Sequence, residues 1–136
     1  MDLVRSLKIS ASGMDVQSVR LRILSENIAN ADSLPAEPGG NPYRRKVVSF
    51  QNTLDRAMGI ETVRIRKIGE AKGEFQRRYD PTHPSADKDG YVMAPNVNAL
   101  IEMMDFREAQ QSYQANLSVL EVSKRMIVNT IDILRN

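Results

Sequence analysis

The sequence predicts an α+β fold, with long N- and C-terminal helices pairing as an antiparallel coiled coil and a small β-rich insert between them. Three observations lead to this prediction. Apolar residues recur every seven positions at both ends of the chain, a spacing typical of coiled coils. Prolines and glycines interrupt the middle of the chain. The short strand-like runs between them are too few for a sheet to form the main core.

The last part of the chain, residues 98–136, carries the clearest pattern. Its apolar residues at intervals of seven are Phe106, Tyr113, Leu120, Ile127 and Leu134. A helix over this range would be about 50 Å long at 1.5 Å per residue. A chain of 136 residues cannot cover all sides of such a helix with its own core. We therefore expect it to pair with a second helix.

Residues 2–31 are predicted to form that partner helix. One apolar line consists of Leu7, Met14, Leu21 and Ile28, and a second line on another side consists of Ile9, Val16 and Ile23. Two apolar faces in so small a chain indicate a helix with several neighbours. Gly13 costs a helix about 1 kcal/mol relative to alanine, which favours either a close helix contact or a mobile segment there. Asn27 and Asn30 mark the helix end, because asparagine tolerates the left-handed backbone turn that closes helices.

The middle of the chain, residues 34–96, is the predicted insert. Residues 33–43 contain three prolines and two glycines, which exclude regular structure through most of that loop. Candidate strands cover residues 45–50, 62–66, 75–79 and 91–93, and residues 80–90 form a long turn. Residues 51–58 either continue the first strand or make one helical turn, and the pattern does not separate these two.

Composition and charge exclude several classes of protein. The formal net charge of +2 argues against a dedicated nucleic-acid binder. The absence of cysteine removes disulfides, thiolate metal sites and cysteine nucleophiles, and it fits either the cytoplasm or an oxidising compartment. No apolar run approaches the ~20 residues of a membrane span, so an integral membrane protein is not expected. The first residues lack the pattern of a cleavable signal peptide, so any export is expected to follow another route.

No residue pattern predicts an enzyme, a cofactor or a metal site. His83 is the single histidine and has no cysteine or serine partners that would build a triad or a zinc site, so a turn residue is the favoured interpretation. The aspartates between residues 80 and 89 resemble a calcium loop only in part. Such a loop would begin at Ser85 and end at Asn96, where the motif requires Asp and Glu. An ordinary turn is again favoured.

Two further groups have a functional and a structural interpretation. The basic residues of the insert, Arg44, Arg45, Lys46, Arg64, Arg66 and Lys67, lack interleaved aromatics and phosphate-binding glycines. We therefore interpret them as the solvated face of a small sheet. The neighbouring methionines Met103 and Met104 fit adaptable packing at a partner surface and ordinary core packing equally well.

Three stretches together carry a resemblance to a known family. They are Ser12-Gly13-Met14-Asp15 through Asn27-Ile28-Ala29-Asn30-Ala31-Asp32-Ser33, Tyr79-Asp80-Pro81-Thr82-His83-Pro84-Ser85-Ala86-Asp87, and Pro95-Asn96-Val97-Asn98-Ala99-Leu100-Ile101-Glu102-Met103-Met104-Asp105. The first resembles the N-terminal signature of the bacterial flagellar axial proteins, which are the rod, hook and hook-associated subunits. Family members often continue with a threonine and then Gly-Tyr. Here Ser33 stands for the threonine, and a Pro/Gly-rich stretch follows it. That departure and the other two stretches resemble the proximal-rod subfamily, and the resemblance spans the whole chain.

The resemblance implies a structural subunit of the flagellar basal-body rod. Such subunits polymerise into the shaft that transmits torque from the membrane ring to the distal rod and hook and that encloses the export channel. The implied partners are copies of the chain itself, other proximal-rod proteins, the distal-rod protein and the rod-base protein. The implied route is the flagellar type III export apparatus, without a cleavable signal peptide, to a rod that lies in the periplasm. No nucleic-acid partner is implied.

The resemblance and the apolar patterns together give a domain division and two sets of contact residues. Residues 1–33 and 97–136 would form the coiled-coil core of the rod, and residues 34–96 the outer insert. The helix pair would use Leu7, Met14, Leu21, Ile28, Phe106, Tyr113, Leu120, Ile127 and Leu134. Contacts between subunits would use Ile9, Val16, Ile23, Asn27, Ala29, Asn30, Met103, Met104, Val119, Val122 and Met126.

Two alternatives stay open at the level of sequence. A basic coiled-coil nucleic-acid binder predicts salt-sensitive DNA binding, although the final helix has no contiguous basic region. A helical adaptor outside the flagellum predicts a stably folded oligomer of defined size in solution. A rod subunit is expected instead to be monomeric in solution with loosely ordered terminal helices.

Overall fold

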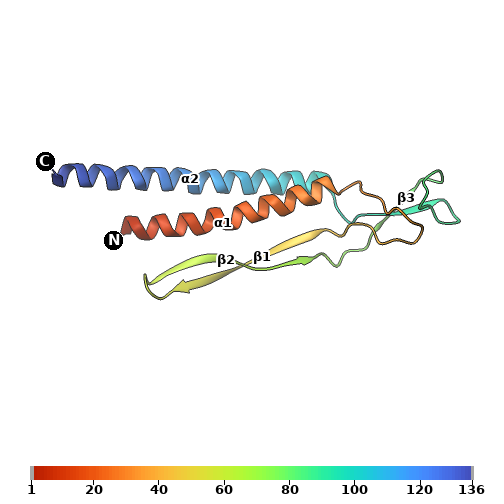
Figure 1. The fold of residues 1–136 in the computed structure, drawn as a ribbon, viewed down its shortest axis with the longest axis horizontal. Coiled ribbons are helices and arrows are strands. Elements are labelled where there is room, and N and C mark those ends of the chain that lie inside the picture. The colour runs from red at the N-terminus through yellow and green to blue at the C-terminus, as the bar shows by residue number, and fades with distance from the viewer. Residues whose placement is uncertain (1, 136) are drawn as a thin grey trace. The chain divides into compact units, whose positions relative to one another are not determined.

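The computed structural model describes residues 2–135 and confirms the α+β prediction (Figure 1). The elements in chain order are α1 (Asp2–Ala29), β1 (Lys46–Asp55), β2 (Ile60–Glu70), β3 (Gln76–Tyr79), β4 (Tyr91–Ala94) and α2 (Ala99–Arg135). Met1 and Asn136, which the predicted terminal domain includes, lie outside the described residues. No helix within residues 2–135 is long and apolar enough to cross a membrane.

The end of α1 differs in one detail from the prediction. The helix ends at Ala29, and both the backbone N–H of Asn30 (3.1 Å) and its side-chain Nδ2 (2.8 Å) donate to the carbonyl oxygen of Glu26. No residue other than glycine has a positive φ within the described chain, so the expected left-handed asparagine is wrong. The side-chain amide instead gives a carbonyl of the last turn a second hydrogen bond beside the one from the backbone.

The start of α2 depends on Asn98. Its Oδ1 accepts hydrogen bonds from the backbone N–H groups of Leu100 at 3.1 Å and Ile101 at 3.3 Å. These amides belong to the first turn of a helix, where no carbonyl precedes them to serve as acceptor. Buried Pro95 lies shortly before this cap. A proline inside a helix would break it, so α2 cannot extend past Pro95 toward the N-terminus. The helix begins at Ala99, within one residue of the predicted boundary.

The two helices pair antiparallel, as predicted. Gly13 lies against Asn116, where a Cβ built on the glycine would be 2.9 Å from Asn116 Nδ2. Further along α1, Arg20 forms an ion pair of 3.6 Å with Glu108. Asn27 then donates a 2.9 Å hydrogen bond to Glu102. The contacts therefore run toward the C-terminus along α1 and toward the N-terminus along α2, by about the same number of residues on each helix.

The strands form two separate two-stranded sheets. In the first, β1 continues to Asp55, so the strand alternative for residues 51–55 is right and the helical turn is wrong. Residues 56–59 form the turn to β2, where Gly59 adopts a φ of 62° and donates to the Asp55 carbonyl. In the second sheet β3 and β4 are antiparallel, with Gln76 opposite Ala94 and Tyr79 opposite Tyr91.

The backbone contacts divide the chain into two compact units, and each unit combines helix with strand. One consists of Met1–Leu21, Ser49–Lys67 and Arg107–Asn136, and the other of Arg22–Val48 and Ile68–Phe106. In the first unit, the β1–β2 hairpin lies along α1 on the side away from α2 (Figure 1). An ion pair between Lys8 and Asp55 joins the hairpin to the helix. These units differ from the expected division into terminal helices and insert, and that division stays a prediction.

Candidate assembly interface

The seam between the paired helices is lined by small and polar residues of α2. Glu102 and Ala109 are completely buried and Ser123 is 5% exposed, and half-buried Asn116 completes the same seven-residue series. Small side chains let two helix backbones approach closely, as the contact between Asn116 and Gly13 shows. Of the two interpretations offered for Gly13, the close helix contact is therefore the one present.

The residues expected to pair the helices lie beside this seam. The half-buried members are Leu7, Met14, Leu21, Ile28, Phe106, Tyr113, Leu120 and Ile127. Leu134 differs, because it is 81% exposed. In the register that places Gly13 against Asn116, the first residue of α1, Asp2, is level with Ile127. Leu134 lies seven residues further along α2, so no described residue of α1 lies opposite it.

The residues expected to touch neighbouring subunits fall into two groups. Ile9, Ala29, Met103, Met104, Val119, Val122 and Met126 are exposed and free for such contacts. Val16 (4%), Ile23 (3%) and Asn27 (0%) are buried inside the chain, and Asn30 is half-buried. Val16 lines a pocket that the β1–β2 hairpin helps to enclose, with Thr62, Val63 and Ile65 on the hairpin side. A strand-covered second face of α1 was not foreseen from the sequence.

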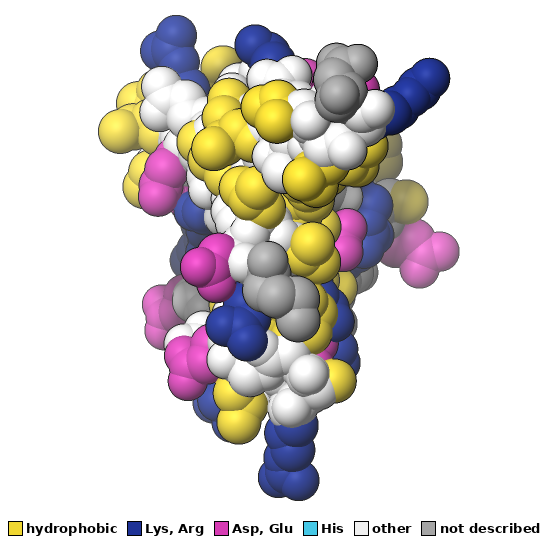
Figure 2. All heavy atoms as spheres, turned by 90° about the vertical axis from the view of Figure 1, so that its left-hand side faces the viewer, with side chains coloured by type: hydrophobic (Ala, Val, Ile, Leu, Met, Phe, Trp, Pro, Cys, Tyr) yellow, Lys and Arg dark blue, Asp and Glu magenta, His cyan; other side chains and the backbone are white. Residues whose placement is uncertain are grey.

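The outer surface of α2 carries a second apolar line, also with an interval of seven. Val119, Met126 and Ile133 are 45%, 51% and 77% exposed, and Val122 beside them is 52% exposed. Other exposed apolar residues of the helix are Leu100, Ile101, Met103, Met104, Val128, Ile131 and Leu134. Figure 2 looks at the end where α1 begins and α2 ends, and shows hydrophobic side chains gathered over the helices with charged groups around them. So much exposed apolar surface is unusual for an isolated soluble chain and typical of an interaction site.

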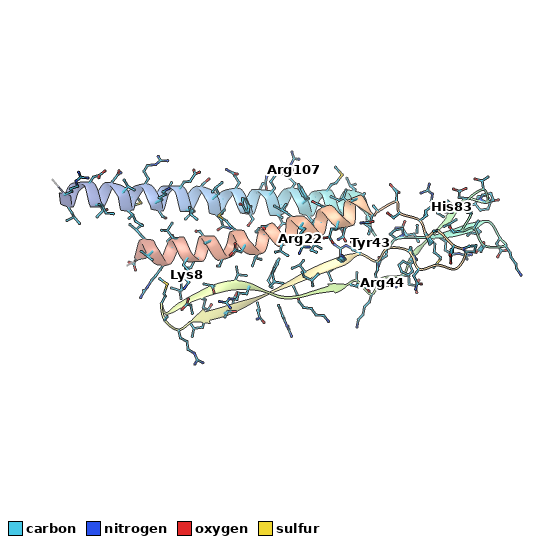
Figure 3. All side chains as sticks on the ribbon, viewed as in Figure 1. Lys8, Arg22, Tyr43, Arg44, His83 and Arg107 are labelled. Carbon is cyan, nitrogen blue, oxygen red and sulfur yellow. The ribbon has the colours of Figure 1, made fainter. Side chains whose placement is uncertain are left out.

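A buried polar cluster joins the end of α1 to β1 and α2. Asn27 makes four hydrogen bonds, the full capacity of its amide. Its Nδ2 donates to the Lys46 carbonyl and to Glu102 Oε2, both at 2.9 Å. Its Oδ1 accepts from the Lys46 N–H at 2.9 Å and from the Tyr43 hydroxyl at 2.8 Å. Figure 3 shows Tyr43 extending from the chain before β1 toward α1. The amide therefore pairs with both backbone groups of Lys46, as a neighbouring strand would.

Glu102 is the second centre of this cluster, which we call the helix-end cluster (Asn27, Tyr43, Arg45, Lys46 and Glu102). Its Oε1 forms an ion pair and hydrogen bond with Arg45 Nε, and its Oε2 accepts from Asn27. Arg45 also lies 3.8 Å from a carboxylate oxygen of Asp105. A carboxylate is costly to bury unless charged and polar partners surround it, and here both of its oxygens have one.

Ion pairing at the rim of the cluster shifts two pKa values. Lys46 Nζ lies 2.8 Å from Glu26 Oε2. This hydrogen bond holds the pKa of Glu26 below its ordinary value and raises the pKa of Lys46. Burial raises the pKa of the Tyr43 hydroxyl, which keeps it a protonated donor toward Asn27 at neutral pH. Glu26, Lys46 and Tyr43 are thus in the protonation states that their hydrogen bonds require.

The remaining sequence candidates lie in turns or on surfaces. His83 lies in the loop between β3 and β4, and its Nδ1 accepts from the backbone N–H of Ser85 at 3.1 Å (Figure 3). The Ser85 hydroxyl lies 2.6 Å from the same nitrogen, so the expectation that His83 has no serine partner is wrong. The carboxylate of Asp87 accepts from the backbone N–H groups of Asp89 and Tyr91 in the same loop. Within residues 2–135 no three histidine, aspartate or glutamate side chains group as metal ligands would.

The basic residues of the insert also divide between structure and surface. Arg44 stacks over the Phe75 ring at 4.2 Å, Arg45 binds Glu102, and Arg64 and Arg66 are exposed on β2. Sequence reasoning missed the roles of Tyr43 and Glu102. One signal was available for Glu102, because it stands seven positions before Ala109 in a line of small residues where a carboxylate is out of place.

Comparisons with known proteins agree with one another. Residues 88–133 match the family described as flagellar basal body rod FlgEFG protein C-terminal. The flagellar basal-body rod protein FlgC of Agrobacterium fabrum is 52% identical over 128 residues, which cover 94% of this chain and 92% of the relative. The protein of that name from Salmonella typhimurium is 40% identical over 96% of this chain and 97% of its own length. The one from Bacillus subtilis is 35% identical over 98% and 99%. From these full-length matches, the chain belongs to the FlgC family of flagellar basal-body rod proteins.

Proposed function

We propose that this chain is a polymerising subunit of the proximal part of the flagellar rod, the shaft that carries torque from the membrane ring to the distal rod and hook. Rod-protein relatives of nearly equal length support a structural role in the rod. The proposal goes further, in that the subunits also enclose the export channel with their terminal helices.

The exposed apolar line of α2 is the observation that carries the proposal. Val119, Met126 and Ile133 repeat the seven-residue interval of a coiled-coil seam, yet they are 45%, 51% and 77% exposed in the single chain. A lattice in which each copy covers this line on its neighbour would bury it. Contacts between unlike faces of identical subunits generate open helical assemblies when the rotation between subunits does not close into a ring, and a shaft requires such an assembly.

The finer parts of the proposal concern partners and location. The partners are copies of this chain, other proximal-rod proteins, the distal-rod protein and the rod-base protein. The subunit reaches the periplasmic rod through the flagellar type III export apparatus without a cleavable signal peptide. The exposed members of the contact set, including Ile9, Met103 and Met104, would touch neighbouring subunits. Residues 34–96 would lie toward the outside of the rod and select its partners.

An in-frame deletion in the native host tests the proposal. We expect non-motile cells whose isolated basal bodies contain membrane rings without rod or hook in electron micrographs. A plasmid copy of the unaltered gene should restore both motility and the rod, which controls for effects on neighbouring genes. Motile cells with complete hooks would contradict the proposal and leave the helical adaptor as the better hypothesis.

A further inference from the structure

The hairpin of β3 and β4 leaves one of its two faces uncovered. Side chains alternate between the faces along a strand, and the register places Arg77 opposite Met93 and Tyr79 opposite Tyr91. These four residues, which we call the tyrosine face, are all exposed, with Tyr79 at 65%, Met93 at 41% and Tyr91 at 38%. Val92 points to the other face and is 1% exposed. The chain therefore covers the face of Val92 and leaves the tyrosine face open.

Contacts within the hairpin hold the side chains of the tyrosine face in place. The Tyr79 and Tyr91 rings meet edge to face, with their centroids 5.2 Å apart. A Cβ built on Gly90 would be 3.0 Å from Tyr79 Cε2, so this ring lies against the glycine. The Arg77 guanidinium lies 4.7 Å from the Tyr91 centroid and 3.3 Å from Asp87. Tyrosine, arginine and methionine are enriched at protein interfaces, and side chains already fixed lose little entropy on binding, so a protein partner is favoured.

The turn at residues 36–39 of the same compact unit has the complementary chemistry. Glu37 and Pro38 are exposed, and no described residue forms an ion pair with Glu37. A 3.0 Å hydrogen bond from the Gly40 N–H to the Glu37 carbonyl fixes the turn. Aromatic side chains bind proline-containing segments, and a guanidinium with five N–H donors can bind a second carboxylate beside Asp87. The turn therefore offers a proline and a carboxylate to a surface that binds both.

We propose that the tyrosine face is a contact between copies of this chain, and that it receives Glu37 and Pro38 of the neighbouring copy. Glu37 reaches Arg77, and the Pro38 ring lies against the tyrosines. The turn and the face are unlike surfaces, so the contact repeats from copy to copy. A contact of so few residues is weak alone, and the exposed line of α2 supplies the effective concentration in the lattice. The inference rests on the proposed function, because it needs assembled copies.

Two cysteines in this cysteine-free chain report the contact in assembled rods. Ala36 and Met93 are exposed, and their replacement leaves Glu37, Pro38 and both tyrosines unaltered. Ala36→Cys with Met93→Cys in one chain, expressed in the deletion strain, should give a ladder of dimers and longer species when isolated basal bodies are treated with a short thiol crosslinker. Each single variant should remain monomeric. The matched control, Ala36→Cys with Lys72→Cys at an exposed position before β3, should give no ladder.

A charge exchange tests the same contact in case the cysteines disturb assembly. Glu37→Arg and Arg77→Glu should each reduce the swimming radius by at least about twofold, because like charges then meet. The two together should restore it. Arg77→Gln also loses the ion pair with Asp87 but gains no negative charge for Glu37→Arg to bind, so this combination should not be restored.

The outcomes separate this inference from the proposed function. Rods that contain the chain but give neither a ladder nor a charge rescue would overturn the inference alone. Impaired single charge variants without rescue or ladder would assign the tyrosine face to another rod protein, which also rejects a second copy as its occupant. Rods that form normally in the deletion strain would overturn the proposed function and this inference together.

Discussion

At the scale of single residues, several side chains make hydrogen bonds with backbone groups that would otherwise pair within a helix or a sheet. Asn27 takes the place of a strand beside Lys46, Asn98 caps α2, and Asn30 closes α1. Asp87 does the same in the loop before β4, where its Oδ1 accepts from the N–H groups of Asp89 at 3.0 Å and Tyr91 at 2.8 Å. Side-chain amides both donate and accept hydrogen bonds and carboxylates accept them, so both can pair with backbone groups without a partner strand.

One prediction concerns acid and Asp87. The hydrogen bond from Tyr91 N–H, together with the ion pair to Arg77, holds the pKa of Asp87 below its ordinary value. A depressed pKa in the folded chain means that this carboxylate contributes stability above its unfolded pKa and loses the contribution as the pH falls through the folded value. Asp87→Asn, which does not titrate, should therefore show a smaller decrease in urea midpoint between pH 6 and about pH 3 than the unaltered chain.

The control is Asp89→Asn, which removes a carboxylate of the same loop that accepts none of these hydrogen bonds. Its urea midpoint should change with pH as in the unaltered chain. If the urea midpoint of Asp87→Asn falls on acidification as much as that of the unaltered chain, Asp87 does not contribute to the loss of stability in acid.

At the scale of elements, α1 meets two different kinds of neighbour. On one side of α1 the close approach of α2 depends on small residues, and on another side strands cover Val16. Between paired helices, an added methyl group is tolerated only if the facing side chain can move. At Gly13 the facing atom is the amide end of Asn116, which itself donates to the Ser112 carbonyl at 3.1 Å.

The second prediction follows from this contact. Gly13→Ala combined with Asn116→Ser should raise the free energy of unfolding by up to about 1 kcal/mol, because alanine favours the helix and the smaller serine makes room. Gly13→Leu should lower it by roughly 1–3 kcal/mol, since the side chain cannot fit without separating the helices. Ser18→Leu on the exposed side of α1 is the control and should change stability little. Thermal unfolding followed by circular dichroism measures all three, and a neutral Gly13→Leu would disprove close packing there.

At the scale of the whole molecule, the apolar surface of α2 exceeds what its own chain covers. The inner line beside the seam is half-buried from Phe106 to Ile127, whereas the outer line and neighbouring Val122 are exposed. We expect these two lines to separate folding from assembly, because a charge on the inner line should disturb the helix pair, whereas a charge on the outer line should not.

The third prediction uses that separation. Val122→Asp should leave helix content and stability nearly unchanged and yet abolish motility and rod formation in the deletion strain, because Val122 is 52% exposed in the single chain. Leu120→Asp should lose helix content as well as the rod, since Leu120 is half-buried beside α1. Ser118→Asp, at an exposed polar position, should assemble normally. Motile cells with complete rods from Val122→Asp would remove the outer line from the assembly surface.

The sequence alone was enough for the fold class, both helices and the family. The seven-residue lines of Leu7 and Phe106 are local patterns, and helix type and amphipathicity depend mainly on such local spacing. The four strands were also found, although β1 and β2 extend well beyond their predicted ends. Their ends depend on hairpin pairing and on the turn at Gly59, which no short window of sequence contains.

Only the tertiary structure decided which apolar residues stay available to other subunits. Val16 and Ile23 have the same local pattern as exposed Ile9, and they are buried because residues much later in the chain fold over α1. Asn27 and Glu102 are 75 positions apart in the sequence, so the local sequence around either residue does not predict their contact. Burial and polar pairing are set by long-range packing, whereas helix formation follows from neighbours three and four residues away.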